Sequence, residues 1–222
     1  NRWHLTVSND TENIEKDSKF ESEKLENIVK KCNKVLHKVR KLRTPPSLDK
    51  KQLNSWNALV IKGLAVSGRV LDRKDYIQSA RESLEFIEKN QFDKNILMAC
   101  YINKMSKFPA YLDDHAFLLD AILEFLQSKW DTKLLHFAIK LADTLIDNFM
   151  DEEKGGFFFT RNNHEKLIFR SKPMSDDAMP SGNGIACFSL QRLGFLVGDE
   201  KYLHASKKTL DSGFSLLKES PH

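Results

Sequence analysis

Two kinds of helical segment alternate along most of this chain. One kind has apolar residues on nearly every side and is predicted at 53–70, 113–129 and 182–197. The other kind has apolar residues on one face only and is predicted at 74–90, 132–149 and 200–217. A helix that is apolar all round must be covered on every side, whereas an amphipathic helix can face water. The alternation therefore predicts an all-α fold with an inner and an outer layer, an α/α toroid, with a curved α-solenoid as the alternative.

Three segments do not fit this alternation. A first amphipathic helix is predicted at 21–43, because a proline pair follows at 45–46 and proline disfavours helical geometry in the residue before it. Residues 1–20 are polar and are expected to be an irregular lead-in. Residues 155–170 contain Gly-Gly-Phe-Phe-Phe and an Asn-rich turn, which predict one small β-hairpin. Residues 21–222 are expected to form a single domain of α/α hairpins. The start without methionine indicates a fragment of a longer chain.

Composition excludes several classes of protein. The 222 residues are 41% hydrophobic and 30% charged, with a formal net charge of +4, which is too mild for a dedicated nucleic-acid surface. No apolar run reaches the length of a membrane span. The three cysteines are widely spaced and form neither a disulfide framework nor a zinc pattern, which favours a reducing, cytoplasmic compartment. We expect no cofactor and no metal, since no His/Asp spacing matches a ligand signature.

Each of the three apolar helices follows an acidic or polar opening. The openings are 45–57, 110–117 and 175–185. If the inner helices run parallel, their N-termini meet at one end of the barrel. Carboxylates beside aromatic rings suit a polyhydroxylated ligand, because acids accept hydroxyl hydrogen bonds and rings stack on the C–H face of a sugar. Two carboxyls about 6.5–9.5 Å apart could also act as the acid and base of an inverting glycosidase.

The candidate site residues follow from these openings. The candidate catalytic residues are Asp114, with Asp176 or Asp49 as its partner. The candidate substrate-binding residues are Trp56, Asn57, Tyr111, Asp113, His115, Ser181 and Asn183. The structural alternative is helix capping, which Asp and Ser favour, together with core packing of the aromatic residues. Capping is a weaker explanation for two adjacent aspartates, because one cap needs one carboxylate.

Four motifs also carry a family resemblance. They are Leu-Asn-Ser-Trp-Asn at 53–57, Tyr-Leu-Asp-Asp-His-Ala-Phe at 111–117, Gly-Gly-Phe-Phe-Phe-Thr at 155–160 and Pro-Ser-Gly-Asn at 180–183. Over about 45–195 the chain resembles the thioredoxin-domain-containing, spermatogenesis-associated protein family. The resemblance implies a thioredoxin-like domain followed by a toroid related to six-hairpin glycosidases and N-acylglucosamine 2-epimerases. This chain would hold about seven of that toroid's twelve helices.

The chain departs from the family pattern at its openings. Lys50 and Met179 stand where the family carries acids, and Asp177 stands where it carries glycine. Our leading hypothesis is a domain that binds or processes a carbohydrate-like small molecule. The alternative is a non-catalytic helical scaffold, attached to a thioredoxin-like domain, that docks a protein partner. A partial toroid would expose an apolar side of an inner helix, which predicts pairing with another copy or with a missing segment.

Overall fold

The chain divides into two compact units, Asn1–Asp49 and Lys50–His222. The computed structural model describes residues 22–219, so the predicted lead-in at 1–20 lies outside the described residues. The expectation of one domain over 21–222 stays a prediction. Within the described residues, no helix is long and apolar enough to cross a membrane.

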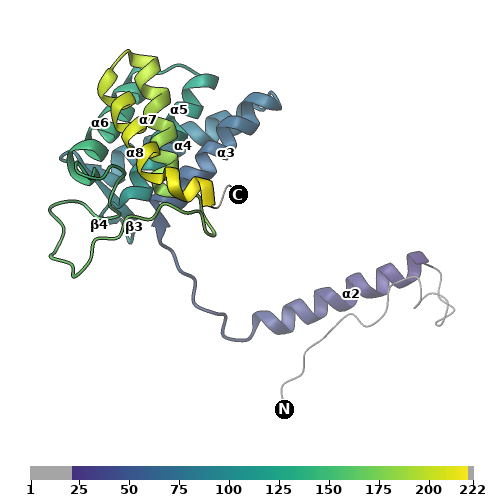
Figure 1. Ribbon diagram of the computed structural model, residues 1–222. Helices are drawn as coiled ribbons and strands as arrows, with labels where there is room; N and C mark the ends of the chain where they lie inside the picture. Colours follow the sequence, from purple (N-terminus) through teal and green to yellow (C-terminus); the bar gives the residue numbers. More distant parts are fainter. Residues whose placement is uncertain (1–21, 220–222) are drawn as a thin grey trace. The chain divides into compact units, whose positions relative to one another are not determined.

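The first unit contains helix α2 (Ser22–Lys41), close to the predicted range (Figure 1). Its first turn carries an acid, Glu23, and its last turn carries bases, which complements the helix dipole. The apolar side chains of α2 are about half exposed, as at Val35 and Val39. The helix is therefore amphipathic without a core of its own.

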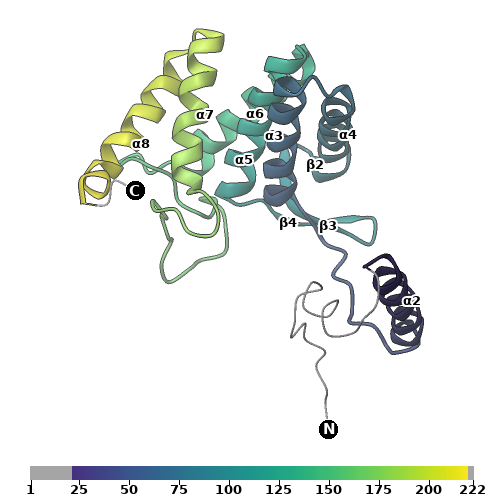
Figure 2. The ribbon, with the colours of Figure 1, turned by 90° about the vertical axis from the view of Figure 1, so that its right-hand side faces the viewer.

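The second unit is built of three helical hairpins whose bounds agree closely with the predicted ranges. They are α3 (Asn54–Val70) with α4 (Lys74–Gln91), α5 (Leu112–Ser128) with α6 (Thr132–Phe149), and α7 (Gly182–Val197) with α8 (Glu200–Glu219). The inner helices α3, α5 and α7 pack in a row with α5 in the middle, and each also packs on the second helix of its hairpin (Figures 1 and 2). This is the predicted arrangement of inner and outer helices.

Helix α5 is the centre of the core. Every residue of its first three turns, from Leu112 to Leu123, is buried except Asp113. The outer helices bury single stripes instead, such as Ala80, Leu84 and Ile87 on α4. Fully burying a leucine or phenylalanine side chain contributes roughly 1.5–3 kcal/mol. The all-round apolar sequence of α5 is thus explained by neighbours on every side.

Ion pairs join the three inner helices across the middle of α5. Asp120 is buried, and its carboxylate lies 2.7 Å from Lys62 Nζ of α3 and 3.0 Å from Arg192 Nη1 of α7. Glu124, one turn later, lies 2.9 Å from Arg192 and 3.3 Å from Arg69 of α3. The pairs therefore fix the order and register of α3, α5 and α7.

The segment that connects α4 to α5 forms most of a small β-sheet. Strand β3 (Ile96–Ile102) pairs antiparallel with β4 (Met105–Pro109), and also with the two-residue strands β1 (Gln52–Leu53) and β2 (Phe92–Asp93). Two-residue turns at 94–95 and 103–104 have positive φ at both residues, as type I′ hairpin turns require. The molecule thus contains a small β-hairpin, at 96–109 rather than at the predicted 155–170.

Residues 155–170 form turns, and their backbone pairs with several different elements. An isolated bridge joins Met150 and Phe157. Phe158 N donates to Phe149 O at the end of α6, and Phe159 N donates to Ser171 O. The apolar triplet is therefore held by tertiary contacts instead of a second strand, which is why its strand-like composition was misleading.

Candidate functional site

The N-termini of the three inner helices meet at one end of the second unit. Asp114 Oδ1, in the first turn of α5, accepts a hydrogen bond of 2.9 Å from Ser55 N of α3. Asp113 Oδ1 lies against Gly182, the first residue of α7, so closely that a Cβ at that glycine would collide with it. Residues from the second and third openings therefore lie together beside the first turn of α3, as the parallel arrangement predicts.

Asp114 acts as a cap. Its second oxygen, Oδ2, accepts a hydrogen bond of 2.9 Å from Tyr111 N and completes a capping box. Burial raises the pKa of Asp114, and the hydrogen bonds from Tyr111 and Ser55 oppose that rise. Because both oxygens already accept backbone hydrogen bonds, protonating this carboxyl would disrupt the start of two helices. Its geometry is that of a structural carboxylate.

Asp113 is the carboxyl with an unused oxygen. Its Oδ1 is buried and accepts no hydrogen bond from any described residue. Burial, together with a smaller contribution from the neighbouring charge of Asp114, raises the pKa of Asp113 to about 6. A carboxyl that titrates near neutral pH can donate a hydrogen bond in one state and accept one in the other, as a general acid or base must. We predicted Asp113 as a ligand-binding residue and Asp114 as the catalytic one, and both assignments stay predictions; of the two, only Asp113 has a buried carboxylate oxygen that accepts no hydrogen bond from a described residue.

In the opening before α7, the polar side chains form hydrogen bonds that cap the start of the helix. Asp176 is exposed, and its Oδ1 accepts a hydrogen bond of 2.8 Å from Ser181 N. Ser181 is the N-cap, and its Oγ accepts from Gly184 N at 3.4 Å. Asp176 and Asp113 thus lie against adjacent residues, 181 and 182, at the start of α7. One oxygen of Asp176 is engaged in capping.

Asn183 fastens the segment before α7 to the helix. Its Oδ1 accepts from Phe157 N at 2.6 Å, and its Nδ2 donates to Phe157 O at 2.9 Å and to Pro173 O at 2.7 Å. The side chain is buried, and the two bonds to Phe157 are shielded from water, whereas the bond to Pro173 is partly buried. Asn183 therefore has a positioning role and no hydrogen-bonding capacity left over on its amide nitrogen.

His115 and Tyr111 lie two residues after and two residues before Asp113, and both pack against aromatic rings from outside α5. His115 is buried against the Phe149 ring, and its Nδ1 lies 2.9 Å from Tyr111 O, so that nitrogen carries the proton and donates. Burial, with a smaller contribution from the charge of Arg161, lowers the pKa of His115 to about 4 against the opposing effect of the hydrogen bond to Tyr111, so this imidazole is neutral at pH 7. The Tyr111 ring stacks on Phe159 with centroids 5.1 Å apart.

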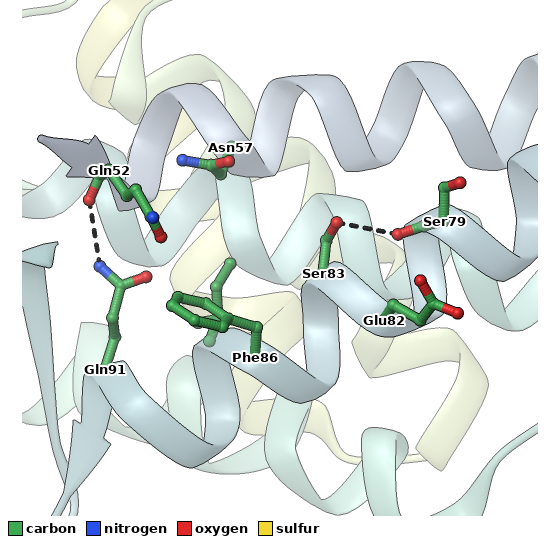
Figure 3. A pocket seen from close by; sticks show the side chains of 8 residues that line it. Gln52, Asn57, Ser79, Glu82, Ser83, Phe86 and Gln91 are labelled. Atoms are coloured by element: carbon green, nitrogen blue, oxygen red, sulfur yellow. Dashed lines mark hydrogen bonds between the residues drawn. The ribbon is translucent and has the colours of Figure 1, made fainter. Parts of the chain in front are cut away.

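Two predicted residues on α3 are exposed. Trp56 is 59% exposed. Asn57 donates to Leu53 O at 2.7 Å and lines a recess of about 340 Å³ between α3 and α4, together with Gln52 and Phe86 (Figure 3). Asp49 is the last residue of the first unit and is exposed. The cluster around Asp113 is formed by residues of the second unit alone.

Polar groups that we did not predict lie in the segment after α6. Buried atoms of Thr160 (Oγ1), Arg161 (Nε and Nη1) and His164 (Nδ1) have no hydrogen-bond partner within the described part of the chain. The His164 ring lies 6.2 Å from the Tyr111 ring. The only sequence signal was Arg161-Asn-Asn-His164, which we took for a turn. Across residues 22–219 no group of three or more His, Cys, Asp or Glu side chains could hold a metal ion.

The hairpins and the shared N-terminal end define part of an α/α toroid of the six-hairpin glycosidase type. In fold the chain is similar to the GH76 α-mannanase of Bacteroides thetaiotaomicron (TM-score 0.62, 17% identity, 78% of this chain and 47% of that one). It is also similar to a sugar epimerase from a ruminal bacterium (TM-score 0.61, 13% identity, 74% of this chain and 45% of that one). A third similar structure is an α-1,6-mannanase of Salegentibacter sp. (TM-score 0.57, 15% identity, 72% of this chain and 46% of that one). That enzyme was solved as an inactive variant with two consecutive aspartates replaced, bound to α-1,6-mannotriose.

By sequence, the chain is related to spermatogenesis-associated protein 20. It is 30% identical to the human protein over a match of 179 residues, which covers 76% of this chain and 23% of the human protein. The rat protein is 29% identical, and the match covers the same fractions of this chain and of that protein. These relatives confirm the family resemblance carried by the four motifs. No protein-family model matches the chain. The chain spans about a quarter of the length of these curated relatives.

Proposed function

We propose that the N-terminal end of the inner helices binds a carbohydrate-like small molecule, with Asp113 as its principal contact. The observation that carries this proposal is the unpaired, buried oxygen of Asp113 at the junction of α5 and α7. A buried carboxylate oxygen without a partner is unfavourable by about 1–3 kcal/mol. A ligand hydroxyl that donates to this oxygen would remove that penalty, and it would bind more tightly for that reason.

Residues that flank Asp113 in the sequence, and the segment after α6, carry other groups that could contact a sugar. Tyr111, two residues before Asp113, stacks on Phe159 and offers an aromatic surface. Arg161 and His164 carry nitrogen atoms without partners among the described residues, and these can hydrogen-bond to hydroxyl oxygens. Ligand sites combine a mainly apolar wall with a few such convergent polar groups.

The similar structures support a sugar ligand by analogy of fold. They include a mannanase and a sugar epimerase, and in the Salegentibacter enzyme a pair of consecutive aspartates is replaced in the inactive variant. The adjacent Asp113 and Asp114 at the start of α5 are the corresponding kind of pair in this chain.

If the domain is catalytic, Asp113 is our candidate for the acid or base and Asp176 for the second carboxyl. Both lie at the first residues of α7, and the free oxygen of Asp176 is exposed. A proton on Asp113 would be available near pH 6, where this carboxyl titrates. Asp114 would then be a positioning residue, because its hydrogen bonds orient the first turns of α3 and α5.

The test is binding of simple sugars to this chain. We would titrate mannose, N-acetylglucosamine, α-1,6-mannobiose and cellobiose by calorimetry and by ligand-observed NMR. We expect binding of at least one of them, weakened about tenfold or more by Asp113→Asn, which removes the carboxylate and keeps its shape. The matched control is Asp177→Asn, at an exposed carboxyl near the same helix, which should bind like wild type.

Absence of binding to a folded chain would contradict a sugar site in this part of the protein. That result would favour the scaffold hypothesis, for which the structural roles of Asp114, His115 and Asn183 already provide some support. For the longer protein we propose a thioredoxin-like domain, as the family resemblance implies. The free cysteines Cys32, Cys100 and Cys187 fit the reducing cytoplasm that we propose as its compartment.

A further inference from the structure

The turn at residues 160–164, after α6, carries a guanidinium group without an acidic partner. The second unit contains six arginines, and four of them form ion pairs with aspartate or glutamate: Arg69, Arg73, Arg81 and Arg192. A fifth, Arg170, donates a hydrogen bond of 2.6 Å to a backbone oxygen. The side chain of Arg161 forms neither an ion pair nor a hydrogen bond with any residue in 22–219, although its Nε and Nη1 atoms are buried.

This isolation is unfavourable for Arg161. Burial lowers the pKa of its guanidinium, because the surroundings disfavour the charged form. The group is nevertheless charged at neutral pH, since an arginine side chain does not lose its proton in proteins. A charged donor removed from water without an acceptor raises the free energy of the folded state. An anion that accepts hydrogen bonds from Arg161 would remove this penalty.

Two further groups without partners lie in the same turn. His164 N donates to Arg161 O at 3.2 Å, which closes the turn and brings these two residues close together. His164 Nδ1 is buried and unpaired among the described residues, and so is the Oγ1 of Thr160, a residue that is only 7% exposed. A hydroxyl, a guanidinium and an imidazole can all donate hydrogen bonds. The turn therefore gathers three possible donors within five residues.

The turn is held against the middle one of the three hairpins. The His164 ring lies 6.2 Å from the ring of Tyr111, the N-cap residue of α5. The charge of Arg161 acts on His115, in the first turn of the same helix. Asn162 N donates to a backbone oxygen at the end of α6 at 2.8 Å. The turn therefore lies at the start of α5, the helix whose first turn also carries Asp113.

We infer that Thr160, Arg161 and His164 form a site for an anionic group, either a carboxylate or a phosphate. Hydrogen bonds from a guanidinium to such a group are charge-assisted and about twice as strong as neutral ones, so an anion satisfies Arg161 better than a hydroxyl does. The local charge agrees, because residues 161–172 contain four lysines and arginines and a single acid. Arg161 and His164 are half-buried, so part of each side chain is open to solvent.

This site narrows the class of sugar, and in that respect the inference rests on the proposed function. The ligand is then an acidic sugar, a uronic acid or a sugar phosphate. One of its hydroxyls donates to Asp113, and its acidic group accepts from Arg161. A neutral sugar would leave the charge of Arg161 uncompensated and would bind less tightly for that reason.

The first test compares sugars that differ only in an acidic group. Calorimetry would measure binding of glucose against glucuronate and of mannose against mannose 6-phosphate, which also distinguishes a carboxylate from a phosphate. We expect at least one acidic sugar to bind about tenfold or more tightly than its neutral counterpart. Arg161→Gln should reduce this preference to less than about twofold. Equal binding of the acidic and neutral forms, or a preference that persists in Arg161→Gln, would overturn the inference.

The matched control is Lys166→Gln, which removes one positive charge from an exposed residue of the same segment. This variant should keep the wild-type preference for the acidic sugar. If it loses the preference as fully as Arg161→Gln does, the general charge of the segment is responsible and the assigned site is wrong. Circular dichroism and urea unfolding would verify that both variants are folded.

The second test uses anions without a sugar, namely inorganic phosphate and acetate. The arginine Nε–H signals would be followed by ¹H–¹⁵N NMR, with the Arg161 signal assigned by its absence in Arg161→Gln. We expect this signal to shift on titration, and the signal of Arg192, which is already paired with Asp120, to shift less.

The two tests separate this inference from the proposed function. A shift of the Arg161 signal with either anion, together with no binding of any sugar, would support the anion site and contradict the sugar site. Binding of neutral sugars without a response of Arg161 to any anion or acidic sugar would support the sugar site and overturn the anion site. No response to any of these probes by the folded chain would overturn both.

Discussion

Asp114 Oδ1 accepts a hydrogen bond of 2.9 Å from the backbone nitrogen of Ser55, 59 residues earlier in the chain. The same carboxylate also accepts from Tyr111 N, so one side chain caps α5 and holds the start of α3. This relationship explains why an aspartate is buried at the first turn of the most buried helix. It also assigns the two members of the Asp113–Asp114 pair to different tasks.

Replacing Asp114 with alanine should destabilise the second unit by about 2–4 kcal/mol. Two backbone N–H groups lose a charged acceptor, and hydrogen bonds to charged groups contribute more than neutral ones. The measurement is urea unfolding followed by circular dichroism. Asp177→Ala, at an exposed carboxyl, is the control and should change the free energy of unfolding by less than about 0.5 kcal/mol. Equal effects of the two substitutions would contradict the capping role.

Replacing Asp113 with asparagine should alter the pH dependence of stability. The folded-state pKa of Asp113 is about 6, above its unfolded value of about 3.9, so between these pH values the folded state binds more protons. The wild-type free energy of unfolding therefore loses this contribution as pH rises from about 4 to 6. Asparagine does not titrate, so the Asp113→Asn variant keeps its stability over this range. Above pH 6 its free energy of unfolding should exceed that of the wild type by about 1–2 kcal/mol.

The measurement is the difference between the two unfolding free energies at pH values from 4 to 8. His115 has a lowered pKa and contributes in the opposite direction over the same range, since it must remain neutral when folded. Its contribution is present in both proteins and cancels in the difference. A difference that is constant with pH would mean that Asp113 titrates normally.

Asn183→Ala should release the segment between α6 and α7. The two hydrogen bonds that Asn183 donates to Phe157 O and Pro173 O, and the one that it accepts from Phe157 N, are lost, which costs about 2–4 kcal/mol. Limited proteolysis should then cleave within 157–173 faster than in wild type, as read by mass spectrometry. Asn163→Ala, at an exposed residue of the same segment, should leave the cleavage rate unchanged.

Asp120→Ala should loosen the packing of all three inner helices. The substitution removes a buried carboxylate that pairs with Lys62 and Arg192, and breaking such a buried network costs about 3–5 kcal/mol when the partners stay buried. Because both cations are partly exposed, we expect the free energy of unfolding to fall by about 2–3 kcal/mol, measured by chemical unfolding. In a double-mutant cycle, Asp120→Ala with Arg192→Ala should cost less than the sum of the single substitutions. Simple additivity would mean that the ion pair contributes nothing.

The sequence by itself determined the helices and their two kinds. Helical periodicity is local, so the ranges of α3 to α8 and the central burial of α5 follow from which faces are apolar. The meeting of the openings at one end was predicted on the condition that the inner helices run parallel, and the contacts of Asp114 with Ser55 and of Asp113 with Gly182 agree with it. The motifs at 53–57, 111–117, 155–160 and 180–183 carried the family resemblance.

Only the tertiary structure decided which polar groups are in use. Asp113 and Asp114 are adjacent and identical in the sequence, but Asp114 meets Ser55 and Asp113 meets Gly182, and the helix pitch points them to different neighbours. The pairing of Asp120 with Lys62 and Arg192 likewise spans 58 and 72 positions. The Phe-rich segment after Gly156 had the composition of a strand, but its hydrogen bonds go to Asn183 and to the end of α6. Hydrogen bonds between distant segments depend on how the helices pack, and local sequence patterns do not contain that information.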